Sequence, residues 1–272
     1  MPAACAPSRM ATPFRVAGRP KSVQIVHKEN PLGECRFNSK NIGRRMCLRA
    51  ENREKEKGHS TLIDPFCLVE AGDYPIGGES DTAFVQQFLI GKTPVTNRQY
   101  LDYLEATHHS DPLRSDLGLS EILGNLPAVD LSWHEAKAYC DWFGQTHEVT
   151  CGMPTANEWE AAARGKQGLL YPWGMTFEPG HCLSLDECSP GPVPVGSFEN
   201  GASPCGALDM VGLVWQWTET LEASGEAVLK GGSWMDAEWG LRTNRSILSD
   251  CNHSTFNTGF RICIRNIEDL YP

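Results

Sequence analysis

Three short polar signals in the middle of the chain are each followed by apolar residues at helical spacing. Thr96, Ser132 and Thr155 stand three residues before a Gln or Glu, and this pair forms a capping box that bonds the first free N–H groups of a helix. Apolar residues then recur at intervals of three and four. The pattern predicts three helices, with Gly144 ending the second and Gly165 ending the third.

The segments on either side of these helices have a different pattern. Apolar and polar residues alternate over residues 61–74 and again over 83–90, which predicts one strand in each segment and a turn near residues 75–79. After Gly165, glycine, proline and isolated aromatic residues dominate about a hundred residues. Because a compact domain rarely contains a structureless loop of that length, we expect short strands and turns there. The pattern after Gly165 therefore predicts a fold rich in short strands and turns, held together by buried aromatic residues.

The most apolar segment is residues 206–217, in which two tryptophans, a methionine, two valines and two leucines fall within twelve positions. A segment of this composition must be buried, because burying apolar surface contributes about 25 cal/mol per Å². Its two glycines, Gly206 and Gly212, allow turns or close backbone approaches. We therefore expect this central stretch to form the middle of the core, with residues 230–234 and 259–264 packed nearby.

Charge divides the chain. Residues 1–60 contain 13 Lys and Arg against 5 Glu, whereas the rest of the chain is strongly acidic. The first 60 residues also lack an apolar period, which predicts a disordered basic extension. A start of the native protein at Met46 and a transit peptide are two other interpretations of this segment.

The location of the protein is inferred from its apolar runs and cysteines. No apolar run is long enough to span a membrane, and the first residues lack the apolar stretch of a secretory signal. The eleven cysteines are scattered without a Cys-x-x-Cys pair, so we expect most to be reduced core residues. We therefore expect a cytoplasmic protein with no membrane partner.

Eight ordered motifs between residues 62 and 264 resemble the formylglycine-generating enzyme, or sulfatase-modifying factor, superfamily. They are residues 94–100, 127–140, 153–165, 171–174, 194–198, 206–217, 231–234 and 259–261. The resemblance implies a variant of the C-type-lectin fold, α+β with little regular secondary structure, formed here by residues 61–267 behind the extension of residues 1–60. Fold alone does not decide function, because the superfamily includes copper and iron oxidoreductases as well as ligand-binding variable proteins.

The resemblance also shows where the chemistry of the superfamily should lie. Formylglycine generators place two copper-binding cysteines just after Gly-Gly-Ser, but no cysteine occurs here between Cys205 and Cys251. The calcium-binding Asn and Glu of the family motif are replaced by Leu213 and Gln216. We also expect no iron site of the sulfoxide-synthase kind, because the eight histidines are scattered and nothing in these residues resembles the helical domain that supplies the iron ligands there. We therefore assign no catalytic residue, metal site or cofactor, and leave copper and iron open.

A groove remains in the place of the active site. The resemblance implies that it is built by the residues after Gly-Gly-Ser and by the loop of residues 246–258, a loop that mixes residue types as retroelement-diversified loops do. The candidate groove residues are Trp234, Asp236, Glu238, Trp239, Arg242, Asn244, Arg245, Asn252, His253 and Phe256.

Two hypotheses about function follow from this groove. The leading one is a binding module for a protein, peptide or small-molecule ligand, since exposed Trp and Arg are typical binding anchors. The alternative is an oxidoreductase acting on a cysteine-containing or small-molecule substrate. We expect no nucleic-acid partner beyond contacts of the basic extension.

Overall fold

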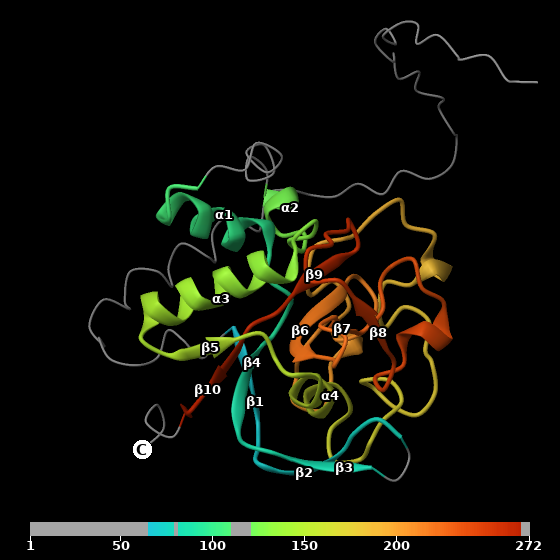
Figure 1. Cartoon of the computed structure of the whole chain (residues 1–272). Helices are drawn as coiled ribbons and strands as arrows, with labels where there is room; N and C mark the ends of the chain where they lie inside the picture. Colours follow the sequence, from blue (N-terminus) through green and yellow to red (C-terminus); the bar gives the residue numbers. More distant parts are fainter. Residues whose placement is uncertain (1–64, 79–80, 110–120, 268–272) are drawn as a thin grey trace, which may run out of the picture. The chain divides into compact units, whose positions relative to one another are not determined.

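The computed structural model describes residues 65–78, 81–109 and 121–267, which all belong to the unit Gly58–Pro272 (Figure 1). The predictions made for the basic extension of residues 1–60 therefore lie outside the described residues. Among the described residues, no helix is both long and apolar enough to cross a membrane.

The three predicted helices are present, and each begins at its capping box. They are α1 (Asn97–Ala106), α3 (Trp133–His147) and α4 (Ala156–Arg164). The hydroxyl groups of Thr96, Ser132 and Thr155 accept a bond from the third helical N–H, and both halves of every box are formed. Gly165 ends α4 as predicted. The short helix α2 (Glu121–Gly124) has no such signal and was not predicted.

The prediction that Gly144 ends the second helix is wrong. Helix α3 continues to His147 and ends at Glu148, whose backbone is left-handed with φ 56°. A Cβ at position 144 would lie 2.9 Å from the carbonyl oxygen of Val149 and 3.3 Å from Cβ of Cys151. The glycine is therefore there to let the strand β5 (Thr150–Gly152) pack closely against the helix.

Each of the two predicted strands before the helices is in fact two strands. The first segment forms β1 (Phe66–Val69) and β2 (Gly72–Pro75), and the second forms β3 (Thr82–Val85) and β4 (Phe88–Gly91). Strand β1 pairs with β4, and β2 pairs with β3. Both arms of this long hairpin break at the same level, so it passes from one sheet into another. The alternating pattern continues through the break, so it does not show where the hairpin changes sheet.

Two four-stranded sheets hold the remaining strands. The first has the order β1-β4-β10-β5, in which β10 (Cys263–Arg265) is antiparallel to both neighbours. The second has the order β8-β7-β6-β9, formed by β6 (Trp215–Leu221), β7 (Ala227–Lys230), β8 (Ser246–Ser249) and β9 (Thr258–Phe260). Its β6 and β9 are parallel. Figure 1 shows α3 beside β5 of the first sheet and α1 on the other side of α3, and α4 contacts β6 and β7.

After Gly165 the described chain has only three one-turn 3-10 helices in addition to strands and turns, as predicted. These are η2 (Leu185–Glu187), η3 (Glu199–Gly201) and η4 (Glu238–Leu241). The central stretch of residues 206–217 is buried along almost its whole length, which confirms the expectation from its composition. Gly212 has φ 73°, and a Cβ there would lie 2.3 Å from the carbonyl oxygen of Leu183.

Arg261 fixes the central stretch to the first sheet. Its fully buried guanidinium donates to the side-chain oxygen of Gln216 at 2.7 Å and to the carbonyl oxygens of Gly91, Leu208 and Asp209. Burial acts against the charge and lowers the pKa of Arg261 to about 10. The cation can be buried because the surrounding oxygen atoms accept hydrogen bonds from it.

Candidate functional site

Two glycines set the direction of the chain where it leaves β7 and enters the predicted groove. Gly231 and Gly232 have φ values of 97° and 72°, and a Cβ on either would lie 2.6 Å from Met210 or Leu241. The chain then turns at Ser233, whose N–H and hydroxyl donate to the carboxylate of Asp236 at 2.9 and 2.7 Å. Asp236, a predicted groove residue, therefore holds this turn in place.

The turn presents an exposed tryptophan next to an arginine. Trp239, on η4, has 62% of its surface exposed. The guanidinium carbon of Arg245 lies 5.2 Å from the centre of the Trp239 ring. A cation over an indole face at this distance is attracted by about 0.5–1 kcal/mol at an exposed site. The pair therefore forms an exposed surface that is both aromatic and charged.

A buried tyrosine connects two further groove residues to this surface. The hydroxyl of Tyr171 lies 3.3 Å from Oε1 of Glu238 and also bonds Arg242. Burial raises the pKa of Tyr171 above its usual value, against the lowering effect of Arg242, so the hydroxyl is neutral. We call Glu238, Trp239, Arg242 and Arg245 the tryptophan–arginine surface.

The segment between the two arginines is held rigidly. Thr243 is fully buried, its hydroxyl donates to the carbonyl oxygen of Leu169 at 2.6 Å, and its N–H donates to that of Leu170 at 2.9 Å. Asn244, another predicted groove residue, donates its side-chain N–H to the carbonyl oxygen of Gly77 at 3.3 Å. The backbone that carries Arg242 and Arg245 is therefore fixed to the body of the domain.

The other predicted groove residues make different contacts. Trp234 packs against the buried cluster of Leu183, Leu213 and Val214, and its ring lies 6.2 Å from the half-exposed Phe256. Asn252 and His253 instead bond Asp250, whose pKa is lowered mainly by the backbone N–H of Asn252. Asn252 and His253 lie in a loop that contacts the start of α3, where the N–H of Trp133 donates to the carbonyl oxygen of Cys251.

An aromatic cluster beside Tyr171 was not among the predicted site residues. The Trp173 ring stacks on Tyr171 at 5.6 Å, Phe177 packs edge-on to Tyr171, and the ring of His181 lies 5.2 Å from Trp173. The density of aromatic residues between 171 and 181 is the sequence signal that could have found this cluster. It extends the aromatic character of the surface that Tyr171 supports.

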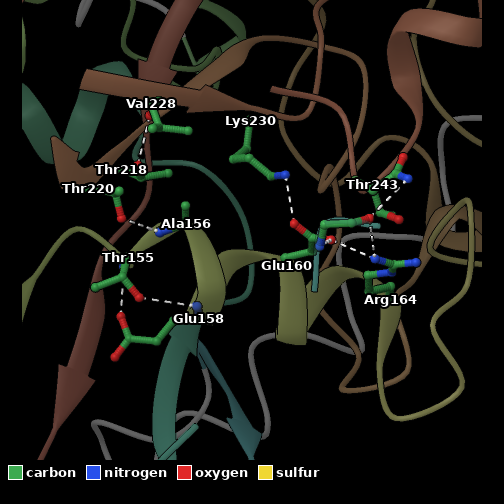
Figure 2. Close-up of polar contacts among 12 residues, drawn as sticks. Thr155, Ala156, Glu158, Glu160, Arg164, Thr218, Thr220, Val228, Lys230 and Thr243 are labelled. Atoms are coloured by element: carbon green, nitrogen blue, oxygen red, sulfur yellow. Dashed lines mark hydrogen bonds and ion pairs between the residues drawn. The ribbon is translucent and has the colours of Figure 1, made fainter. Parts of the chain in front are cut away.

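Three charged side chains are buried together next to the glycine turn (Figure 2). The carboxylate of Glu160 accepts from Lys230 at 2.9 Å and from Arg164 at 2.6 Å, and also from the N–H of Gly77 at 2.7 Å. All three charged side chains are at most 5% exposed. Desolvation by burial lowers the pKa of Lys230. The contacts fix the end of β7, and with it the glycine turn, against α4.

The two residues expected to replace calcium ligands lie deep in the core. Leu213 is 1% exposed and packs with Leu183 and Val214. Gln216 accepts from the indole N–H of Trp159 at 2.8 Å and donates to the carbonyl oxygen of Asp209 at 2.8 Å, in addition to its bond from Arg261. Both atoms of the Gln216 amide are therefore engaged within the protein. The absence of calcium stays a prediction.

The described residues contain no group of three or more His, Cys, Asp or Glu side chains placed to hold a metal ion. The eight cysteines that the structure describes are free thiols, and four of them are buried.

Comparison with known proteins agrees with this architecture. Residues 51–267 match the family described as sulfatase-modifying factor enzyme 1-like domain, and the chain belongs to this family. PvdO from Pseudomonas aeruginosa has a TM-score of 0.62 at 19% identity, covering 73% of this chain and 93% of its own. Variable protein 1 of Treponema denticola has a TM-score of 0.62 at 17% identity, covering 74% and 94%. The fold is the α+β, C-type-lectin-like fold of formylglycine-generating enzymes, as predicted.

Two curated relatives have more similar sequences. An inactive Cα-formylglycine-generating enzyme 2 from Bos taurus is 33% identical over 156 residues, which cover 53% of this chain and 50% of the relative. A hercynine oxygenase from Mycolicibacterium thermoresistibile is 29% identical over 230 residues, which cover 62% and 50%. The chain thus spans about half the length of these relatives.

Proposed function

We propose that this protein is a binding module of its family, and that the tryptophan–arginine surface recognises a peptide segment with an acidic group beside an aromatic or apolar side chain. The observation that carries the proposal is Trp239, which is 62% exposed with Arg245 at 5.2 Å from its ring. An aromatic ring and a guanidinium group offer an apolar contact and a charge partner to the same segment of a ligand.

The rigidity of the surface supports this proposal. Buried Thr243, the glycine turn and the Ser233–Asp236 contacts fix the backbone on both sides of η4. A surface that is ordered before binding loses less conformational entropy when a ligand binds. Tryptophan and arginine are also the residue types that most often dominate binding energy at interfaces.

The sequence after Gly-Gly-Ser supports a role other than formylglycine generation. No cysteine occurs between Cys205 and Cys251, where the resemblance places the copper-binding pair. One curated relative is itself named an inactive formylglycine-generating enzyme.

Selection of a displayed random peptide library on the full chain tests the proposed function. We expect enrichment of peptides with Asp or Glu next to an aromatic or apolar residue, and affinities that fall with added salt. Trp239→Ala should weaken binding of the selected peptides by at least about tenfold, the loss expected for a binding hot spot. Arg245→Ala should weaken the acidic peptides more than their amide-substituted versions.

Phe84→Ala is the matched control, because Phe84 is an exposed aromatic residue on β3 with 61% of its surface accessible. This variant should bind the selected peptides as the unchanged protein does. Failure to enrich any peptide, or equal losses for Trp239→Ala and Phe84→Ala, would refute the proposal.

The second candidate is an oxidoreductase, favoured by the relative named hercynine oxygenase. Metal analysis of protein purified without chelators separates the two functions. Stoichiometric copper or iron would support the oxidoreductase and count against the binding module.

A further inference from the structure

Two cysteines from distant parts of the chain meet beside a pocket that shares no lining residue with the tryptophan–arginine surface. Cys67 lies on β1, and Cys205 lies in a turn closed by the N–H of Ser203 and the carbonyl oxygen of Ala207. Both side chains pack in one apolar cluster, and each thiol shifts the pKa of the other. Gly206 allows this approach, since it has φ 91° and its Cβ position lies 3.7 Å from Sγ of Cys67.

The pocket gives a small molecule access to one of the two sulfur atoms. It has a cavity volume of about 420 Å³, and Cys205, Pro204, Tyr74 and Lys166 are among the residues that line it. Cys205 is partly exposed whereas Cys67 is buried. A reagent entering the pocket therefore reaches Cys205 first.

The surroundings of Cys205 stabilise a thiolate. The neighbouring thiol of Cys67, the hydroxyl of Ser203 at 3.3 Å, the N–H of Ala207 and the charge of Arg261 favour the thiolate, whereas in its thiol form Cys205 donates to the carbonyl oxygen of Ala162 at 3.5 Å. These contacts outweigh burial and lower the pKa of Cys205 to about 6, while the same contact raises the pKa of Cys67. The pair thus holds one proton on the buried sulfur and leaves the accessible sulfur as the nucleophile.

We propose that Cys205 and Cys67 form a thiol–disulfide exchange site that reacts with low-molecular-weight disulfides. The thiolate of Cys205 attacks one sulfur of the small disulfide, forms a mixed disulfide and releases the other half as a thiolate. The sulfur of Cys67 then attacks Cys205, and its proton goes to the departing small thiolate. The protein dithiol is oxidised by two electrons to one disulfide, and the small disulfide is reduced to two thiols.

A lysine at the pocket suits a disulfide whose halves carry carboxylates. The ammonium group of Lys166 lies 5.8 Å from the centre of the Tyr74 ring and 3.6 Å from the carboxylate of Glu70, and its side chain is half exposed. It can exchange this exposed partner for a ligand carboxylate, because a surface ion pair contributes little energy. Oxidised glutathione, which carries carboxylates on both halves, is therefore a suitable probe.

A second pair, Cys140 and Cys151, is also in contact but differs chemically. Cys140 is fully buried, and its burial, followed by the contact with Cys151, raises its pKa well above the usual value. The proposal therefore concerns Cys205 and Cys67 alone.

The experiment treats the full chain with oxidised glutathione, blocks free thiols with an alkylating agent and identifies the products by peptide mass spectrometry. We expect a peptide pair joined by a Cys67–Cys205 disulfide in the unchanged protein. Cys67→Ser should stop the reaction at a mixed disulfide, with one glutathione on Cys205. Cys205→Ser should give neither product.

Two measurements keep the test decisive if Cys67→Ser does not fold. The rate of alkylation of Cys205 in the unchanged protein should be half-maximal near pH 6, and Cys188→Ser, which removes an exposed cysteine outside the pocket, should change nothing. A Cys205 that reacts only at alkaline pH, or oxidation that leaves Cys67 and Cys205 as free thiols, would overturn the proposal. Neither outcome bears on peptide binding by the tryptophan–arginine surface.

Discussion

At the scale of single residues, the central stretch combines tight packing with an unusual backbone. Leu213 is 1% exposed, yet its φ is 57°, in the left-handed region that non-glycine residues rarely adopt. The sequence could predict that Leu213 is buried, because a leucine within so apolar a segment is expected to lie in the core. It could not predict the backbone conformation, because leucine rarely adopts the left-handed region. A positive φ would have been expected at the neighbouring Gly212 instead.

This conformation reverses the usual ranking of two substitutions at position 213. Leu213→Ala should cost about 2–5 kcal/mol through lost burial and the remaining cavity. Leu213→Gly leaves a similar cavity but removes left-handed strain, so it should be about 1 kcal/mol more stable than the alanine variant. Leu213→Asn, which tolerates the backbone but buries an amide, should cost about 2–4 kcal/mol. Chemical denaturation measures all three, and an alanine variant more stable than the glycine variant would contradict the argument.

At the scale of elements, the signals that succeeded are local ones. All three capping boxes formed, because each depends only on residues three positions apart. Signals that depend on distant partners failed: Gly144 makes room for β5 instead of ending α3, and the long hairpin changes sheet inside two continuous strand patterns. Glu160 and Arg164 have the spacing of a surface pair on α4, and only the packing of β7 shows that they are buried.

The buried charges between α4 and β7 should respond unequally to substitution. Glu160→Gln leaves Lys230 and Arg164 buried without their anion, and we expect it to cost about 3–5 kcal/mol. Lys230→Met keeps the apolar stem and leaves a neutral pair of Glu160 and Arg164, so its cost should be below about 2 kcal/mol. Urea denaturation of both variants measures the difference. Equal costs would show that Glu160 does not stabilise the fold by neutralising the two buried cations.

At the scale of the whole molecule, pairings between distant segments close the fold. Strand β10 lies between β4 and β5, and β9 runs parallel to β6, so the last described strands complete both four-stranded sheets. Residue patterns along the chain cannot specify such partners, and here the fold class followed from eight motifs that resemble a known family. For the candidate site, the resemblance gave Trp239 and the two arginines as candidates, and their role stays a prediction. It did not point to the contacts of Tyr171 or to the buried charges near them.

Arg265 on β10 joins this closing strand to the rest of the molecule. Its guanidinium donates to the two carboxylate oxygens of Glu158 at 2.8 and 2.6 Å, and it also lies 3.1 Å from Glu219 on β6. Burial acts to raise the pKa of Glu158, but Arg265 and the N–H of Thr155 outweigh it and lower the pKa overall. A carboxylate with a lowered folded-state pKa stabilises the fold above its unfolded-state pKa, and this contribution is lost as pH falls through the folded-state value.

Glu158→Gln should therefore destabilise the protein by about 1.5–3 kcal/mol at pH 7, the range for a hydrogen bond to a charged group. The difference in free energy of unfolding between the variant and the unchanged protein should shrink as pH falls below 4.5, the ordinary value for the carboxyl. Glu135→Gln is the matched control, since Glu135 caps α3 in the same way but pairs with no cation in the described part of the chain. Its effect should be smaller at pH 7. If the Glu158→Gln difference stayed constant from pH 7 to well below 4.5, the ion pair with Arg265 would not be what stabilises the closing strand.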